Sequence, residues 1–250
     1  MTFAIESIFP MELAGLCYEI ANKTLINNIS FTLQADSRTV ILGPNGAGKS
    51  LLLRLCHGLI QPSSGSIHWH GARTRHPADF QSMVFQRPIM LRRSAQANVE
   101  YALALKGVGR AGRKHLTHEV LKKVGLAEFA KRPARVMSVG EQQKLALARA
   151  WVLKPQVLFL DEPTASLDPA STYAFEEIIA EIHAAGTKVV MTTHNMGQAQ
   201  RLADEILFIH QGQLLEQSSA ASFFSAPKDS RAEAFIRGEL LFNPNQEVNS

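Results

Sequence analysis

Apolar positions along the chain form short runs that are separated by longer amphipathic stretches. Near the start, Leu13–Tyr18 and the alternating segment Ile29–Leu33 predict two strands. Further along, runs rich in aliphatic and β-branched residues predict buried strands at Ser37–Leu42, Val157–Leu160, Lys188–Thr193 and Ile206–His210. Such continuous apolar strands are typical of a sheet that is covered on both faces.

Helical spacing fills the segments between these strands. The predicted helices are Ser50–Leu59, most of 95–130, Gly140–Leu153, about 171–185, Met196–Ala203 and Arg231–Leu241. Gly186 is expected just past the fourth of them, because glycine readily takes the left-handed backbone that ends a helix. Strands that alternate with helices predict an α/β fold with a mostly parallel sheet, and the first strands are expected to form an N-terminal antiparallel β region.

Composition and charge narrow the class of protein. With 250 residues, of which 46% are hydrophobic and 19% charged, the chain can bury a sizeable core in one large or two small domains. The net charge of +4 is weaker than in a dedicated nucleic-acid binder. Two cysteines, Cys17 and Cys56, fit a reducing compartment. The first eighteen residues contain no Lys or Arg and no run reaches eighteen apolar residues, so we expect neither a secretory signal nor a membrane span.

A glycine-rich loop lies between the strand Ser37–Leu42 and the helix that follows it. It reads Gly43-Pro44-Asn45-Gly46-Ala47-Gly48-Lys49-Ser50 and matches the pattern G-x-x-x-x-G-K-[ST]. Its backbone N–H groups and the helix N-terminus predict a concave positive nest for phosphates. Lys49 is expected to reach the β- and γ-phosphates, and the Ser50 hydroxyl to bind Mg²⁺. A chance match arises in about one chain in a hundred of this length.

Two acids directly follow the apolar strand Val157–Leu160. Asp161 stands at the carboxyl end of that strand, where it is placed to hold Mg²⁺ through water. Glu162 is placed to act as general base for the attacking water. A strand that simply ends in solvated acids is the alternative, and the glycine loop upstream argues against it.

Several motifs recur in one order and carry a resemblance to a known family. They are Gln86, the run Ser138-Val139-Gly140-Glu141-Gln142-Gln143, Asp161-Glu162-Pro163-Thr164, Ser166-Leu167-Asp168, and His194 after an apolar strand. Together with the glycine loop they resemble the nucleotide-binding subunits of ATP-binding cassette (ABC) transporters. The resemblance covers about residues 13–224 and implies a RecA-like P-loop core with an inserted helical subdomain.

The resemblance implies ATP and Mg²⁺ as cofactors and a role for each matching residue. Ser138, Gly140 and Glu141 resemble the signature that meets ATP bound to a second copy of the chain. Gln86 resembles the residue that reaches Mg²⁺ and the water, and Asp168 the one that couples the two sites of a dimer. His194 resembles the switch histidine that contacts the γ-phosphate and Glu162; a structural histidine is the alternative.

Tyr18 and Val139 complete the comparison with the family. An aromatic residue at the place of Tyr18 stacks on adenine in the family, and a core tyrosine is the alternative. Val139 stands where the family usually has glycine, and a β-branched residue resists φ > 0 and adds bulk. We therefore expect that Val139 hinders closure of the dimer, unless the local backbone tolerates valine.

The resemblance also implies an organisation of the chain and its partners. Residues 1–225 are expected to form the nucleotide-binding domain, with the core in about 12–86 and 145–225 and the helical subdomain in about 87–144, followed by a helix and polar tail in 226–250. Transmembrane permease subunits and a second copy of the chain are the expected partners. A periplasmic or extracellular solute-binding protein is expected as an indirect partner.

The cargo is a finer inference from the same resemblance. Residues 85–94 and 196–203 look like those of tungstate importers, with molybdate and phosphate importers as close alternatives and polar amino-acid importers next. A soluble ABC ATPase that acts on ribosomes or DNA is a further alternative, but the chain has one P-loop and no heptad run. The implied place is the cytoplasmic side of the cell membrane, without nucleic acid as a partner.

Two further groups of residues have simpler interpretations. His68-Trp69-His70 puts two histidines on one face of a strand, and a plain β-hairpin face is favoured over a metal site, which needs more ligands. Arg87, Arg92 and Arg93 lack interleaved aromatic residues, so a solvated or partner-facing patch is favoured over a nucleic-acid surface.

Overall fold

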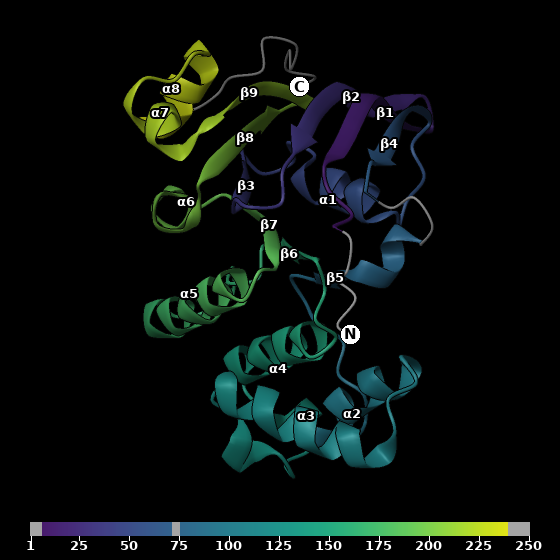
Figure 1. Ribbon diagram of the computed structural model, residues 1–250. Helices are drawn as coiled ribbons and strands as arrows, with labels where there is room; N and C mark the ends of the chain where they lie inside the picture. The colour runs from purple at the N-terminus through teal and green to yellow at the C-terminus, as the bar shows by residue number, and fades with distance from the viewer. Residues whose placement is uncertain (1–6, 72–75, 240–250) are drawn as a thin grey trace.

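A computed structural model describes residues 7–71 and 76–239 of the chain (Figure 1). The strands are β1 (Met11–Ile20), β2 (Lys23–Leu33), β3 (Thr39–Leu42), β4 (Ser64–Trp69), β5 (Gln81–Val84), β6 (Val157–Asp161), β7 (Lys188–Thr193), β8 (Glu205–His210) and β9 (Gln213–Ser219). The α-helices are α1 (Lys49–His57), α2 (Ala95–Leu105), α3 (Arg110–Lys123), α4 (Val139–Trp151), α5 (Pro169–Ala184), α6 (Met196–Leu202), α7 (Ala220–Ser225) and α8 (Ser230–Ile236). Short 3-10 turns are Pro77–Phe80, Ala127–Phe129 and Ala134–Val136.

The strands form two sheets. The larger one has the order β5-β6-β7-β3-β8-β9 and is parallel except for β9, which pairs antiparallel with β8. The smaller one has the order β2-β1-β4 and is antiparallel. The predicted α/β fold, with a mostly parallel sheet and an N-terminal antiparallel β region, is therefore confirmed.

The core lies on both faces of the larger sheet, because successive strand residues point to opposite sides. Val40 and Leu42 of β3 face a cluster that includes apolar residues of helices α2 to α8. Ile41 faces a second cluster, between the two sheets, that is filled by α1 and by the inner face of β1 and β2. The sheet is thus a middle layer, and its strands β3, β6 and β7 are buried along their whole length.

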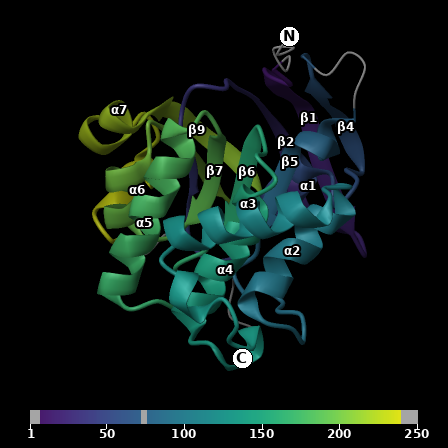
Figure 2. The same ribbon diagram turned by 60° about the horizontal axis from the view of Figure 1, so that its bottom comes forward.

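Helices α2 and α3 pack against each other and against α4 at one end of the molecule, as Figures 1 and 2 show from two sides. The predicted helical stretch 95–130 is divided at Gly107, where φ is +76° and the chain turns before α3 begins. Asn98, in the first turn of α2, is fully buried, and its amide donates to the carbonyl oxygens of Arg93 and Ser94 in the segment before the helix. This helical group is joined to the sheet by β5 on one side and α4 on the other.

Two sequence predictions need correction. The C-terminal helix was expected at Arg231–Leu241, but α8 ends at Ile236 because the chain turns at Gly238, where φ is +73°. The end of that expected helix and the polar tail lie outside the described residues, as do residues 1–6 and 72–75. The strand that carries His68 belongs to no hairpin with its neighbour in sequence, since β4 pairs with β1.

Several other elements agree with their predictions within a residue or two, whereas the strand expected at Ile29–Leu33 begins six residues earlier, at Lys23. The strand Lys188–Thr193 is found as predicted, and the helix expected from Gly140 begins one residue earlier. Gly186 follows α5 with φ +92°, as expected for a glycine past a helix end. Across the two described stretches, no helix is both long and apolar enough to cross a membrane.

Candidate functional site

The glycine loop joins β3 to α1 and opens at the carboxyl edge of the parallel sheet. A Cβ on Gly43 would lie 2.1 Å from the carbonyl oxygen of Ile209, so only glycine fits there. Gly46 and Gly48 have φ of +77° and +99°, and a Cβ on Gly46 would meet nothing within 4 Å. The loop therefore presents backbone to an open space at the N-terminus of α1, where the helix dipole favours an anion.

Lys49 reaches back across this loop from the first turn of α1. Its Nζ donates to the carbonyl oxygens of Gly43 at 2.9 Å and Pro44 at 3.0 Å, and lies 3.4 Å from Glu162 Oε1. The side chain is only 4% exposed. Burial lowers the pKa of Lys49, while the nearby Glu162 carboxylate acts in the opposite direction. The ammonium is thus held inside the loop, close to the Glu162 carboxylate.

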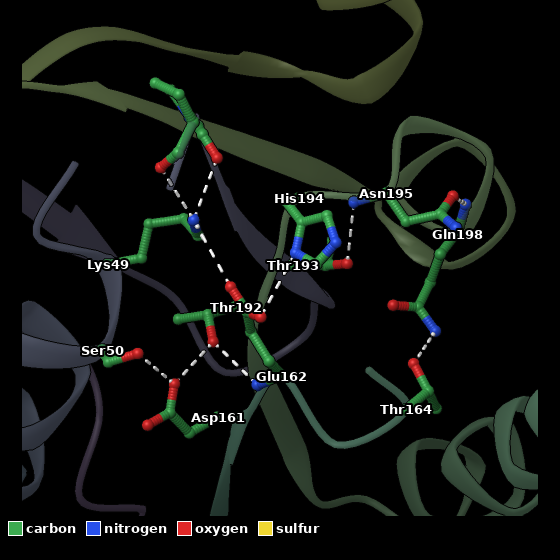
Figure 3. Close-up of polar contacts among 12 residues, drawn as sticks. Lys49, Ser50, Asp161, Glu162, Thr164, Thr192, Thr193, His194, Asn195 and Gln198 are labelled. Carbon is green, nitrogen blue, oxygen red and sulfur yellow. Dashed lines mark hydrogen bonds and ion pairs between the residues drawn. The ribbon is translucent and has the colours of Figure 1, made fainter. Parts of the chain in front are cut away.

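Asp161 is the last residue of β6 and lies beside the start of α1 (Figure 3). Ser50 Oγ donates to Asp161 Oδ1 at 2.6 Å, and Thr192 Oγ1 donates to the same oxygen at 3.0 Å. The Arg54 guanidinium lies 3.6 Å from Oδ2. These neighbours balance the charge of a carboxylate that is only 2% exposed.

Glu162 occupies a left-handed backbone conformation with φ +41°, which is uncommon for a residue that is not glycine. Its N–H donates to Thr192 Oγ1 at 2.9 Å, and this bond helps to hold the unusual backbone. The carboxylate lies between Lys49 and His194, whose Nδ1 is 3.2 Å from Glu162 Oε2. Glu162 and His194 also line one cavity of about 470 Å³.

The oxygen donors beside the loop fit Mg²⁺. Ser50 supplies a hydroxyl and Asp161 a carboxylate, which are the hard ligands that this ion prefers. Within the described ranges, no group of three or more His, Cys, Asp or Glu could hold a metal by itself. Mg²⁺ usually takes one or two protein carboxylates and completes its shell with substrate phosphates and water.

The structure brings five of the predicted site residues together: Lys49, Ser50, Asp161, Glu162 and His194. Gln86 follows β5 with an exposed side chain, and its carbonyl oxygen accepts a hydrogen bond from Gln143 Nε2 at 2.7 Å. Tyr18 lies half-buried in β1, against the cluster between the sheets, and its Cα pairs with that of Ile26.

A second group of predicted residues gathers around another cavity of about 340 Å³, which is lined by Ser138, Gly140, Glu141 and Asp168 among others. Ser138 and Glu141 form a capping box at the start of α4, in which each side chain accepts from the other residue's N–H. Asp168 caps α5 by accepting from Ser171. Both loops therefore end in helix N-termini, which suit a phosphate that approaches from outside.

Val139 does not have the strain that the comparison with glycine suggested. It is the first residue of α4 and is not among the described residues with positive φ. Its side chain is 55% exposed. The backbone of this loop thus accommodates a β-branched residue, since a helical φ is open to valine.

Sequence reasoning missed Thr192 and Gln143. Thr192 stands directly opposite Asp161 in the register of β6 and β7, and it bonds to both acids. The feature that could have revealed Thr192 is a hydroxyl side chain near the carboxyl end of β7, the strand that neighbours β6 and its acids. Gln143 is 2% exposed and connects α4 to the segment of Gln86 through its hydrogen bond. It belongs to the predicted signature run, but no role was predicted for it.

Comparison with known proteins gives the family. The protein-family model described as "ABC transporter" matches residues 26–165. Phosphate import ATP-binding protein PstB 2 of Natronomonas pharaonis is 32% identical over 249 residues, which cover 93% of this chain and 88% of that protein. Phosphate import ATP-binding protein PstB 2 of Aliivibrio fischeri is 37% identical over 245 residues, which cover 91% and 90%. Tungstate uptake system ATP-binding protein TupC of Peptoclostridium acidaminophilum is 35% identical over 194 residues, which cover 77% and 91%.

A solved structure shares the fold. It is that of cbiO1 from Clostridium perfringens, described as part of the ABC transporter complex cbiONQ, with a TM-score of 0.78. The match covers 93% of this chain and 96% of the cbiO1 chain, and the two sequences are 23% identical. At this level of identity the likeness shows the fold alone. Taken with the sequence matches, the loop, the paired acids and the histidine show that the chain belongs to the ABC transporter family, whose ATP-binding subunits are ATPases coupled to transport.

Proposed function

We propose that the chain is the motor subunit of an oxyanion importer and that it drives separate transmembrane permease subunits by binding and hydrolysing ATP. The observation that supports the cargo is that relatives named for phosphate and for tungstate both match over most of the chain. Tungstate is the proposed cargo within this class, on the resemblance of residues 85–94 and 196–203. The chain acts at the cytoplasmic side of the inner membrane, and a solute-binding protein is its indirect partner.

The glycine loop, residues 43–50, takes the phosphates of ATP. Lys49 then exchanges the Glu162 carboxylate, 3.4 Å away, for the β- and γ-phosphates. Ser50, Asp161 and Gln86 would hold Mg²⁺, which would supply positive charge against the phosphate oxygens. Once Lys49 has turned to the phosphates, Glu162 is free to accept a proton from water.

Hydrolysis then needs Glu162 and His194 together. The water oxygen bonds to the γ-phosphorus, the bond to the leaving ADP oxygen breaks, and the water proton passes to the Glu162 carboxylate. His194, 3.2 Å from Glu162 Oε2, orients that carboxylate and contacts the γ-phosphate. Most of the acceleration comes from position and charge rather than from covalent chemistry.

The second residue group serves a second copy of the chain. Ser138, Gly140 and Glu141 line their own cavity together with Asp168, apart from Lys49. We assign them to the ATP held by the partner copy, so that two ATP molecules are enclosed between two chains. Tyr18 stacks on the adenine ring from β1.

The helical group is the part that contacts the permease. We assign residues 1–225 to the nucleotide-binding domain, with a core of about 12–86 and 145–225, a helical subdomain of about 87–144, and a C-terminal segment 226–250. Exposed apolar residues support this docking surface, namely Ile89 after β5 and Tyr101 and Leu105 of α2. Arg93 stacks over Tyr101 with its guanidinium 5.3 Å from the ring centre, so the surface also carries positive charge.

Uptake in the native cells tests the proposal. Cells that lack the chain should lose accumulation of tungstate and regain it with the wild-type chain but not with Lys49→Ala, because the buried cation of the loop is gone. Uptake of phosphate, molybdate and a polar amino acid is measured beside it. If the cells keep tungstate uptake but lose phosphate uptake, the cargo is phosphate rather than tungstate. Full ATP hydrolysis by purified Lys49→Ala would contradict the assigned ATPase site.

A further inference from the structure

Buried polar side chains continue beyond the two acids and connect three segments of the site. Gln198 of α6 is 1% exposed and Glu176 of α5 is 4% exposed. Gln198 Nε2 donates to Thr164 Oγ1 at 2.8 Å, a bond that Figure 3 shows, and to Glu176 Oε1 at 3.1 Å. The amide nitrogen must face Glu176, because the amide oxygen would repel that carboxylate.

Arg201 completes the group and satisfies the buried carboxylate. Its Nε donates to Glu176 Oε2 at 2.8 Å and its second nitrogen to Oε1 at 2.7 Å, so the pair is bidentate. Glu176 therefore receives three hydrogen bonds from α6, which is enough to hold an ionised group in this position. Arg201 and Thr164 line the same cavity as Glu162 and His194.

The segments that these residues join carry the site. Thr164 lies in the tight turn after Glu162, where the Ala165 N–H donates to the Glu162 carbonyl oxygen at 3.2 Å. Helix α6 begins directly after His194, since Asn195 caps it by accepting from the Gln198 N–H at 3.0 Å. Helix α5, which carries Glu176, begins at its cap Asp168.

We propose that Gln198 is a positioning residue that holds His194 and the Asp168 segment in one arrangement around Glu162, through its bonds to Thr164 and Glu176. A displacement of α6 would move His194, and the same bonds would pass that displacement to the turn behind Glu162. The γ-phosphate contact of His194 and the contact of Asp168 with the second copy thus change together. The inference rests on the proposed role of His194 in hydrolysis.

The substitution Gln198→Glu tests this, because it keeps the size of the side chain but replaces its donor with a second carboxylate beside Glu176. We expect kcat for ATP hydrolysis by the purified chain to fall about tenfold, with KM for ATP within about twofold, since the glycine loop is untouched. The matched control is Gln200→Glu, the same change on an exposed residue of α6, which should leave both constants unchanged. Equal kcat values for the two variants would overturn the proposal.

A double-mutant cycle separates positioning from general damage. In the His194→Ala background, Gln198→Glu should lower kcat by a smaller factor than in the wild-type background, because one of the two groups that it positions is already absent. Additive effects would overturn the inference while leaving His194 in its role. A fully active His194→Ala would instead refute the role of His194, and the inference with it.

A second variant and a second measurement test the link between α6 and the turn directly. Thr164→Val removes the hydroxyl that accepts from Gln198 and should lower kcat in the same manner. Amide hydrogen exchange in residues 163–168 should be faster in either variant than in Gln200→Glu. Unchanged exchange in both would contradict the link between α6 and this turn.

Discussion

A single hydroxyl joins the two acids of the site. Thr192 Oγ1 accepts from the Glu162 N–H at 2.9 Å and donates to Asp161 Oδ1 at 3.0 Å, so it uses both its donor and an acceptor position. It thereby supports the left-handed backbone of Glu162 and the orientation of Asp161 at once. A residue of strand β7 thus controls geometry on the neighbouring strand β6.

Removing that hydroxyl should disturb hydrolysis more than folding. Thr192→Val keeps the β-branched shape but leaves the Glu162 N–H without its partner, which costs about 1–3 kcal/mol of unfolding free energy. We expect kcat for ATP to fall at least about tenfold, because Glu162 loses its support. Steady-state kinetics and urea unfolding measure the two effects.

Thr187→Val is the matched control for this substitution. Thr187 is buried as well, and its hydroxyl donates to the Pro155 carbonyl oxygen at 2.9 Å, away from the acids. This variant should lose stability without losing kcat. A similar fall of kcat in both variants would show that Thr192 acts only through stability.

A second residue-scale feature is the buried ammonium of Lys188, which is 1% exposed. Its Nζ donates to Ser37 Oγ at 2.7 Å and Thr39 Oγ1 at 2.8 Å. Burial lowers the pKa of Lys188 from 10.5 to about 8, against the attraction of Glu205. The folded protein therefore carries the full cost of a buried charge below pH 8.

The stability of the protein should rise with pH on account of Lys188. Between pH 8 and 10.5 the unfolded chain keeps the proton that the folded chain has lost, so the free energy of unfolding increases with pH. Relative to Lys188→Met, the wild type should gain up to about 3 kcal/mol over this window. Urea unfolding of both proteins at pH 7, 8, 9 and 10 measures the difference.

Lys122→Met, which removes an exposed charge of α3, is the control for that series. It should change stability by less than about 0.5 kcal/mol. A difference between wild type and Lys188→Met that stays constant from pH 7 to 10 would contradict the assignment.

At the scale of elements, helix N-termini are stabilised where the site needs them. Helix α4 begins with the capping box of Ser138 and Glu141, and α5 and α6 begin with Asp168 and Asn195 as caps. The hydrogen bond from the Ser138 N–H lowers the pKa of Glu141, so this part of the box is lost as pH falls through that lowered value. Helix α1 differs, since its cap is Gly48 without a side-chain bond, and its N–H groups are left for phosphate.

The capping box can be tested by itself. Ser138→Ala removes the oxygen that accepts from the Glu141 N–H at 3.3 Å, and should lower the free energy of unfolding by about 1 kcal/mol. Ser138→Thr keeps a hydroxyl at the cap and should lose less. Urea unfolding at pH 7 compares them, and equal stability of Ser138→Ala and wild type would show that the box contributes nothing.

For the whole molecule, Glu162 and His194 line one cavity and the group of Ser138 and Asp168 lines another, and this arrangement leads to a dimer prediction. Glu162→Gln should still bind ATP through the glycine loop but hydrolyse it slowly, because the general base is lost. Gel filtration with ATP and Mg²⁺ should then show a dimer that the wild type forms only briefly. Glu177→Gln, on the exposed side of α5, is the control and should behave as wild type. A Glu162→Gln chain that stays monomeric with ATP would refute the enclosed-nucleotide arrangement.

Helices and strands with a strong local pattern of apolar residues were predicted, and those with a weak pattern were missed. Strand β7 and helix α4 were found from their apolar patterns because burial on both faces or on one stripe leaves a clear period. Strand β9 was missed because its half-exposed segment QLLEQSS has a weak pattern at the sheet edge. The end of α8 was missed because the turn at Gly238 overrides a helical pattern that continues past it.

The sequence by itself determined the glycine loop, the paired acids, the histidine and most of the buried strands and helices. Each is a local property, since it depends on residues within one turn or one strand. Tertiary structure alone decided that Thr192 bonds to both acids, that Lys49 faces Glu162, and that Gln198 reaches Thr164. These contacts join residues far apart in the chain, and the register of β6 beside β7 and the packing of α6 on α5 bring them together. The local pattern of one segment does not show which distant segment it pairs with. The motif residues could therefore be predicted from the sequence, whereas the contacts that hold them in place could not.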